Sequence, residues 1–220
     1  MLTRKFLELT ATFGADWVNW VLVAVSLTAT TILIDRLVLY VRTRERYRQL
    51  RTAFAASLVD GEIGGAIAAV EGDSLVRNVL RAGLRLAARG ERQAAAIEQI
   101  MLGQLAEERA RYEARLSVLS TIGNVSPLIG LFGTVLGIVG AFYVLGKLGT
   151  AQAAGNPQIM AAIGEALIAT GFSISVAVPA VVAYNALRAH VTARTKHAEA
   201  LMRELVANLP NLRHGGAAGE

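Results

Sequence analysis

The sequence predicts an all-α integral membrane protein with three transmembrane helices, long cytoplasmic helical extensions and an N-out/C-in topology. Over 220 residues the chain is 54% hydrophobic and only 18% charged, whereas a soluble domain carries about 25% charged residues. The apolar residues are concentrated in three blocks, which is typical of membrane spans rather than of a globular core. Lys and Arg are distributed unevenly among the segments that flank these blocks, and this asymmetry predicts the orientation.

The first block is "WVNWVLVAVSLTATTILI", residues 17–34. Its length along a helix is roughly 27 Å, enough to cross the hydrocarbon core. Trp17 and Trp20 lie at one end and Tyr40 beyond the other, where aromatic belts are expected. The apolar run is too long for a signal peptide and no small-residue cleavage site follows it, so we expect a retained anchor.

The second and third blocks, 118–146 and 159–187, are separated only by "KLGTAQAAGNPQ" and should form a tight hairpin. The segment after the first block is rich in arginine, and the tail after the third block is also basic. The only cationic residue of the hairpin loop is Lys147. The positive-inside rule therefore places the N-terminus and the hairpin loop outside. The predicted segments are a periplasmic N-terminus (1–16), transmembrane helix 1 (17–40), a cytoplasmic helical region (41–116), transmembrane helix 2 (117–146), a periplasmic loop (147–158), transmembrane helix 3 (159–187) and a cytoplasmic C-terminal helix and tail (188–220).

The cytoplasmic region has a helical pattern. "AAAIEQIMLGQLAEERARYEARLSVL" consists of strong helix formers, with Ile97, Met101, Leu105 and Tyr112 on one stripe. No helix breaker precedes Gly123, so we expect one long helix continuous with the second span. The tail should extend the third span to about Asn208, before Pro210, and residues 60–74 should form a short helix between two turns.

Several classes of function find no support in the sequence. The chain has no cysteine, and its three histidines all fall in the last 31 residues, so we expect no metal site and no cofactor. No nucleophile–base pair or phosphate-binding loop indicates an enzyme. The net charge of +5 is explained by basic cytoplasmic segments, so we expect no nucleic-acid partner.

Small residues recur along one face of each hairpin helix. In "SPLIGLFGTVLGIVGAF", residues 126–142, the row has spacings of four, three, four and three and comprises Ser126, Gly130, Gly133, Gly137 and Gly140. The third span carries a similar row, made of Ala166, Thr170, Ser173, Ala177 and Ala180. In lipid, helices pack by close backbone approach through small residues. A well-packed bundle would account for the glycines, and the alternative is that the two faces line a common narrow space.

Two threonines lie at similar predicted depth. Thr134 and Thr170 are twelve and about ten residues from the outer ends of their spans, or roughly 15–18 Å below the outer surface. Such a pair of hydroxyls could pass or coordinate a proton or water. The alternative is a bond from each hydroxyl back to its own helix.

Glu165 is the sole carboxylate in the second and third spans. An intramembrane acid is costly and is by default a functional-site hypothesis. Glu165 is, however, about 140° around the helix from Thr170 and only a turn from the helix start. A structural role at the helix N-terminus, or a pairing with a neighbouring chain, is the alternative.

A lone three-span chain makes a poor pore, so several copies would have to surround one. No residue of the hairpin is placed to capture and release a proton at mid-membrane. We therefore expect an oligomer in which a partner helix supplies the missing acid.

"SPLIGLFGTVLGIVGAF" and "IGEALIATGFSISVAVPAVVAYN" resemble the two signature spans of the MotA/TolQ/ExbB proton-channel family. The resemblance covers residues 122–187 and is nearest the three-span ExbB/TolQ branch, since the MotA branch normally has four spans. It implies a multi-pass protein of the bacterial inner membrane. It also implies a homopentamer around two copies of a single-span ExbD/TolR-like partner that carries a membrane aspartate.

The resemblance also assigns residues. Thr134 matches the threonine of "GLFGTVxG", and Glu165 and Thr170 match the glutamate and threonine of "EALxAT". Relatives often have tryptophan at the position of Leu136 and glycine at that of Ser173, and Ser173 could join the proton path. The residues expected to set helix packing and pore shape are Pro127, Gly130, Gly133, Gly137 and Pro179.

The implied function is that of a proton-channel and stator subunit, which couples the proton motive force to mechanical work on the cell envelope. Relatives serve TonB-dependent transport, the Tol–Pal system or gliding motility, with a TonB-, TolA- or gliding-type effector. The alternative is a non-conducting membrane scaffold that organises partner helices. Replacing Thr134 or Thr170 separates the two, because a scaffold should survive the loss of two hydroxyls.

Overall fold

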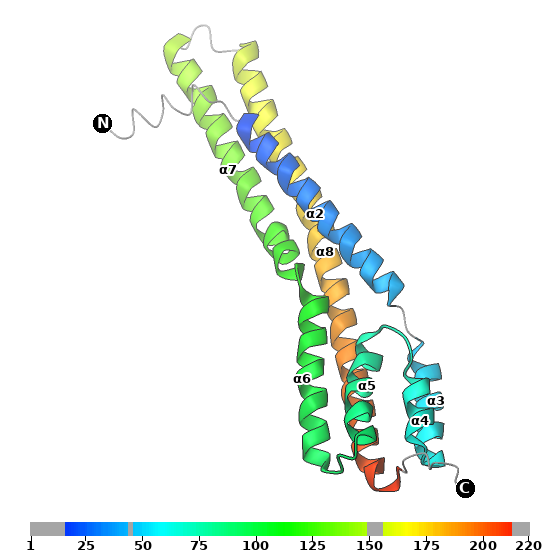
Figure 1. Ribbon diagram of the computed structural model, residues 1–220. Helices are drawn as coiled ribbons and strands as arrows, with labels where there is room; N and C mark the ends of the chain where they lie inside the picture. The colour runs from blue at the N-terminus through cyan, green and yellow to red at the C-terminus, as the bar shows by residue number, and fades with distance from the viewer. Residues whose placement is uncertain (1–15, 44–45, 149–155, 213–220) are drawn as a thin grey trace, which may run out of the picture. The chain divides into compact units, whose positions relative to one another are not determined.

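The computed structural model describes residues 16–43, 46–148 and 156–212, and every element within them is a helix (Figure 1). This confirms the predicted all-α class. The elements are α2 (Asp16–Arg42), α3 (Tyr47–Asp60), α4 (Ile63–Ala69), α5 (Leu75–Ala88), α6 (Ala94–Glu113), α7 (Leu116–Leu148), α8 (Pro157–Asn208) and the short 3₁₀ turn η2 (Leu209–Asn211). Residues 1–15, most of the predicted loop and the last eight residues lie outside the described part.

Three helical stretches, which include α2, α7 and α8, are long and apolar enough to cross a membrane. Many of their large apolar side chains are exposed, among them Leu27, Leu131 and Ile168. An apolar surface of this kind suits lipid or neighbouring helices rather than water. By length and composition these stretches match the three predicted spans.

The chain divides into two compact units. The hairpin unit comprises the described residues up to Asp35 together with those of Arg115–Ala186, and so contains α2 as far as Asp35, all of α7 and the N-terminal part of α8. The stalk unit comprises the described residues of Arg36–Ala114 and those from Leu187 to Leu212.

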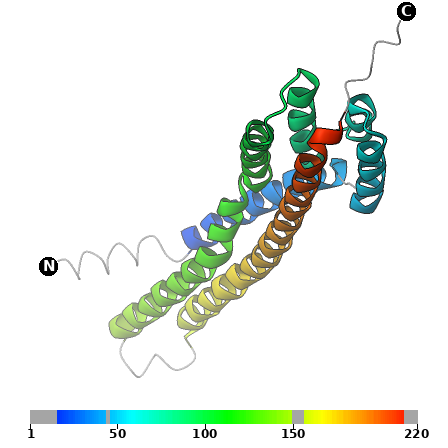
Figure 2. The same cartoon turned by 90° about the horizontal axis from the view of Figure 1, so that it is seen from below.

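In the hairpin unit α7 runs beside the N-terminal part of α8, and both views show the pair side by side (Figures 1 and 2). The N-terminal part of α2 joins them through a small apolar cluster. Val18 and Leu22 of α2 pack with Leu136 of α7, and Ile129 and Phe172 border this cluster. Trp17 adds an edge-to-face contact with Phe132, at 6.2 Å between ring centroids.

In the stalk unit α5 supplies the most sharply amphipathic helix. Its buried face consists of Leu75, Val76, Val79, Leu80, Gly83, Leu84 and Ala87. Facing it, Ile97, Met101, Leu105 and Tyr112 of α6 are all buried, which confirms the predicted stripe. Gly83 lets α6 approach, because a Cβ there would lie 2.5 Å from the sulfur of Met101.

Tyr40 packs inside the stalk unit, where its ring is buried rather than exposed; its expected place at a membrane boundary stays a prediction. It is buried, contacts Tyr112 edge to face at 5.7 Å and lies against the His190 ring. The buried guanidinium of Arg194 lies 5.9 Å from the Tyr40 ring and 5.7 Å from the Tyr112 ring. It also donates to the Thr43 hydroxyl at 3.1 Å. Burial of a cation between two aromatic faces is stabilised by their quadrupoles.

The predicted helix from residue 94 through the second span is not continuous. The helix α6 ends at Glu113, Ala114 is extended (φ −51°, ψ 138°), and Arg115 adopts a left-handed φ of 63° before α7 begins. The left-handed conformation costs a non-glycine residue about 1 kcal/mol or more. The Arg115 guanidinium donates to Asp35 at 3.1 Å, which holds the residue in place.

The helix α8, in contrast, runs unbroken to Asn208 and is followed by η2, which contains Pro210, as predicted. The predicted short helix between turns is also present, as α4 between Gly61 and Gly72, both with positive φ.

Candidate functional site

The glycine row of α7 packs directly against the small-residue row of α8. A Cβ at Gly137 would lie 2.5 Å from the Cβ of Ala166, and one at Gly130 would collide with the Ser173 side chain. Ala166, Ser173, Ala177 and Ala180 are buried along this face. The two rows therefore pack against each other within one chain. This agrees with the alternative in which the glycines serve helix packing rather than line a space.

Two glycines depart from the expected row. Gly140 has nothing within 4 Å of its Cβ position, so it takes no part in this contact among the described residues. Gly123, which the sequence analysis did not include, would place a Cβ 2.5 Å from Val181. Its spacing of seven from Gly130 continues the same helix face and could have revealed it. Gly133 serves a second contact, because its Cβ position lies 3.1 Å from Val18 of α2 and 3.3 Å from Ala169.

Thr170 joins the two hairpin helices. Its hydroxyl donates to the carbonyl oxygen of Gly130 at 2.9 Å, across from α8 to α7. Ser173 is fully buried at the same crossing and donates to the Thr170 carbonyl at 2.8 Å. A glycine at position 130 is what makes the Thr170 bond possible, since a Cβ there would lie 3.1 Å from the Cα of Thr170.

Thr134 donates to the carbonyl of Leu131 at 2.7 Å, within its own helix. This is the back-bonded geometry that serine and threonine often adopt in apolar helices. Because the acceptor carbonyls of the two threonines belong to consecutive residues, Gly130 and Leu131, both hydroxyls lie at one level of the hairpin. The sequence predicted a similar depth for the two hydroxyls, and their common level in the hairpin agrees with that prediction.

Both threonines lie on the side of the hairpin that faces away from α2. Leu136 and Phe172 pack toward Val18 and Leu22 of α2. Thr134 precedes Leu136 by two residues and Thr170 precedes Phe172 by two, which is about 200° around each helix. The two hydroxyls therefore share the flank of the hairpin that α2 leaves uncovered.

Glu165 lies on the other flank. It precedes Phe172 by seven residues, which returns it to the same face of α8, within about 20°. Its side chain is half-buried. The structure thus separates Glu165 from the two threonines and places it toward α2.

The two prolines lie inside the hairpin helices, Pro127 in α7 and Pro179 in α8. Each proline lacks an amide hydrogen and leaves the carbonyl four residues earlier, at Gly123 and Ser175, without its helical donor. Gly123 is also where α7 approaches Val181 most closely. Ser126, directly before Pro127 in α7, is fully buried, and within the described residues its hydroxyl has no hydrogen-bond partner.

Across the described residues no group of three His, Asp or Glu side chains could hold a metal ion. His190 packs against Tyr40, and His197 stacks on Tyr47 at 3.7 Å between ring centroids. These contacts give both rings a structural environment in the stalk unit.

A comparison with protein families matches residues 71–200 to the MotA/TolQ/ExbB proton channel family. The match covers more than half of the chain and includes all the candidate residues in α7 and α8. It confirms the resemblance that the two signature spans indicated.

Among curated proteins, the Tol-Pal system protein TolQ of Pseudomonas aeruginosa is 37% identical over 121 residues, 51% of each chain. The biopolymer transport protein ExbB of Neisseria gonorrhoeae is 37% identical over 107 residues, 49% of this chain and 47% of that protein. TolQ of Haemophilus influenzae is 47% identical over 81 residues, 37% of this chain and 34% of that protein. The chain thus spans about half the length, or less, of the curated relatives it matches. Together with the three apolar helices, these matches identify a multi-pass protein of the bacterial inner membrane.

Proposed function

The chain belongs to the MotA/TolQ/ExbB proton channel family, and we propose that it is the proton-channel and stator subunit of an inner-membrane motor. The observation that carries this proposal is that the family match contains the whole hairpin contact, including Thr134 and Thr170. Both hydroxyls lie at one level on a flank that the chain's own α2 leaves uncovered. A flank of this kind is suited to a helix from another chain.

The proposed assembly is a homopentamer in an N-out/C-in topology, with residues 17–40, 117–146 and 159–187 crossing the membrane. It surrounds two copies of an ExbD/TolR-like single-span partner whose membrane aspartate supplies the titrating acid. This assembly accounts for the exposed apolar surfaces of the hairpin helices, because lipid and neighbouring subunits would cover them.

The hydrogen bonds of the two threonines favour a particular part in proton transfer. Each hydroxyl already donates to a carbonyl, so its oxygen is left to accept. A protonated carboxyl group on a partner helix could donate to such an oxygen. Once that acid has lost its proton, the hydroxyl can rotate and donate to the carboxylate. The threonines would thus recognise both charge states without titrating themselves.

Ser173 and Glu165 take less direct parts in the proposed pathway. Ser173 is buried against Gly130 and bonded to the Thr170 carbonyl, and so fixes the position of Thr170. Glu165 would contribute from the flank that faces α2, as an intramembrane acid set apart from the two threonines. Pro127, Gly130, Gly133, Gly137 and Pro179 shape the hairpin that carries the hydroxyls.

Each proton that crosses supplies about 2.3 kcal/mol per 100 mV, so several must pass for each mechanical step. The work would be delivered to the envelope through a TonB-, TolA- or gliding-type effector. The names of the matched relatives favour the Tol–Pal system or TonB-dependent transport over gliding motility.

The test is proton flux into liposomes that contain this chain with its single-span partner. We expect the Thr170→Val substitution to lower the flux by about tenfold or more, because valine removes the hydroxyl that would hydrogen-bond the partner's acid in both charge states. The matched control is Thr121→Val, since Thr121 lies in α7, the other hairpin helix, and only bonds back to Ser117 within its own helix. Size measurements must show that both variants assemble with the partner.

Two outcomes would decide against the proposal. A Thr170→Val complex that conducts like the wild type would remove Thr170 from the path. A fully assembled wild-type complex that never conducts would favour the scaffold instead.

A further inference from the structure

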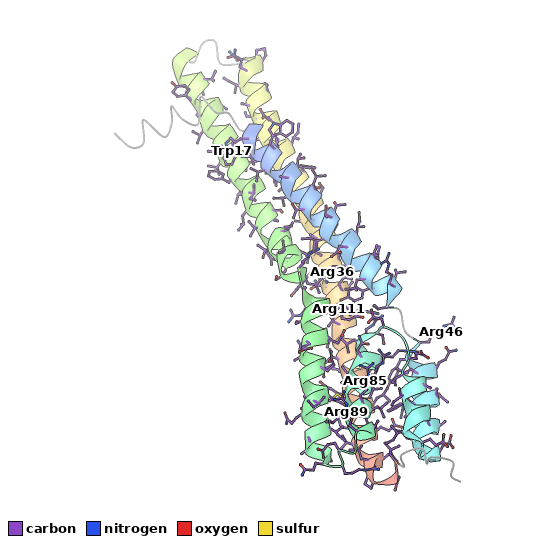
Figure 3. The ribbon with its side chains drawn as sticks, in the orientation of Figure 1. Trp17, Arg36, Arg46, Arg85, Arg89 and Arg111 are labelled. Atoms are coloured by element: carbon purple, nitrogen blue, oxygen red, sulfur yellow. The ribbon has the colours of Figure 1, made fainter. Side chains whose placement is uncertain are left out.

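A pocket of about 380 Å³ opens in the stalk unit, where the first membrane helix ends. Its lining comes from the end of α2, the start of α3 and the loop before α5, and consists of Arg42, Arg46, Gln49, Gly72, Asp73, Ser74 and Arg77. Figure 3 shows Arg46 at the junction of α2 and α3, with Arg85 in the last turn of α5 and Arg89 just after that helix. None of these residues belongs to the candidate proton pathway.

The charge of this pocket is strongly positive. Three of its lining residues are arginines, and within the described chain no hydrogen bond or ion pair engages the guanidinium groups of Arg42 and Arg46. The single carboxylate, Asp73, accepts from Asn78 at 2.9 Å and pairs with Arg111 at 3.4 Å. These hydrogen bonds, that of Asn78 foremost, lower the pKa of Asp73. Its charge is therefore already compensated from outside the pocket.

The third arginine is held in place by the loop. Arg77 donates to the Glu71 carbonyl, and its guanidinium folds over Gly72, whose φ of +121° suits glycine. The Ser74 hydroxyl caps α5 by accepting from the Arg77 amide at 3.3 Å. The first turn of α5 contains no acidic residue, so the positive end of its dipole adds to the field in the pocket. An anion would meet a preformed site here.

The pocket also lies at the edge of an apolar surface. Leu37, Val38 and Val41, all in α2 just before Arg42, are exposed. Exposed apolar residues followed at once by arginine mark the boundary between the hydrocarbon and headgroup layers. Arg42 and Arg46 would thus stand at the level of the lipid phosphates, and in the topology proposed above this is the cytoplasmic leaflet.

We infer that this pocket binds the phosphate of an anionic phospholipid headgroup from the adjoining leaflet. Arginine forks suit phosphate oxygens, and basic pockets on the cytoplasmic side of membrane helices are suited to acidic lipid headgroups. The lipid would connect the end of α2 to the loop that starts α5. The same chemistry would admit a soluble phosphate, so the experiment has to separate the two sources.

The experiment titrates the full-length chain in detergent with phosphatidylglycerol or phosphatidylcholine and counts bound lipids by native mass spectrometry. The pocket variant is Arg42→Gln/Arg46→Gln. The matched control is Arg48→Gln/Arg51→Gln, which removes the same charge from exposed positions of α3 outside the pocket. Unchanged melting temperatures establish that both variants fold.

We expect the wild type to bind phosphatidylglycerol in preference to phosphatidylcholine. The pocket variant should lose about tenfold or more in apparent affinity, since two arginines that would face the lipid phosphate lose their charge. The control should stay within about twofold of the wild type.

Three results would overturn the inference. An equal loss in both double variants would mean general attraction to the membrane surface. Equal binding of the two lipids would remove the role of charge. Direct binding of inorganic phosphate that displaces phosphatidylglycerol would make a soluble anion the ligand.

Discussion

The hairpin unit and the stalk unit both pack helices together, but the first uses small residues and the second uses large ones. The contact between α7 and α8 is made by glycine, alanine and serine, with Gly130 against Ser173 and Gly137 against Ala166. The stalk core is made of large side chains, and Phe54, Leu80, Met101 and Tyr112 are among the fully buried ones. The long helix α8 contributes to both, with small residues in its N-terminal part and Leu201 and Leu205 in its C-terminal part.

The difference follows from the solvent. In water, burial of a large apolar side chain contributes ~1.5–3 kcal/mol. In lipid, burial against another helix removes no water, so stability comes from close packing and from hydrogen bonds between helices. The bond from Thr170 to Gly130 is of the second kind. The two units should therefore respond to opposite kinds of substitution.

The largest effect is expected from deleting a large side chain in the stalk. Phe54→Ala removes a fully buried ring and should destabilise the stalk unit by ~3–5 kcal/mol. Val59→Ala in the same helix is the control, since Val59 is 85% exposed and should change stability by less than ~0.5 kcal/mol. Hydrogen exchange of the α3 and α5 amides measures both. Similar protection in the two variants would contradict the assignment of the core.

The hairpin should instead be sensitive to added volume. Gly130→Ala places a methyl group against Ser173 and 3.1 Å from the Cα of Thr170, and should cost ~1–3 kcal/mol. Gly140→Ala is the matched control, because its Cβ position has nothing within 4 Å. The alanine there should be neutral or slightly stabilising, as alanine favours helix. Thermal unfolding of the purified protein compares the two, and equal melting temperatures would remove Gly130 from the packing contact.

Much of this architecture could be predicted from the sequence, because hydrophobic blocks and helical stripes are strong signals. The end of α8 before Pro210 and the buried stripe of α6 were both visible in the residue types. The break at Ala114 and Arg115 was not. Alanine and arginine are among the best helix formers, and the contact of Arg115 with Asp35, eighty residues away in the chain, cannot be seen in local residue types.

The candidate site was predicted less completely. Spacing identified the small-residue faces and the similar depth of Thr134 and Thr170. It could not show that Thr170 bonds across to α7 while Thr134 bonds within its own helix, because that depends on which helix lies beside which. It also could not show that Val18 of α2 packs against Gly133. The stalk pocket is lined by residues from three separate segments, so no single sequence motif indicated it.

The smallest effect is expected from a titratable group of the stalk. Burial, and then the neighbouring Arg194 guanidinium, lower the pKa of His190 below 6.5. Between the lowered pKa and 6.5 the unfolded chain therefore binds more protons than the folded chain. The free energy of unfolding should fall as the pH drops through that window and should be independent of His190 above it.

His190→Asn should remove this part of the pH dependence, measured as the difference in unfolding free energy between about pH 5 and about pH 8. His197→Asn should retain most of it, because burial and Arg194, the two larger causes, remain. The effect is small because only one imidazole is involved. It belongs to the stalk unit, where His190 lies against the Tyr40 ring and the Arg194 guanidinium lies over the same ring. An identical pH dependence in the wild type and His190→Asn would mean that the ring is as solvated in the folded chain as in the unfolded one.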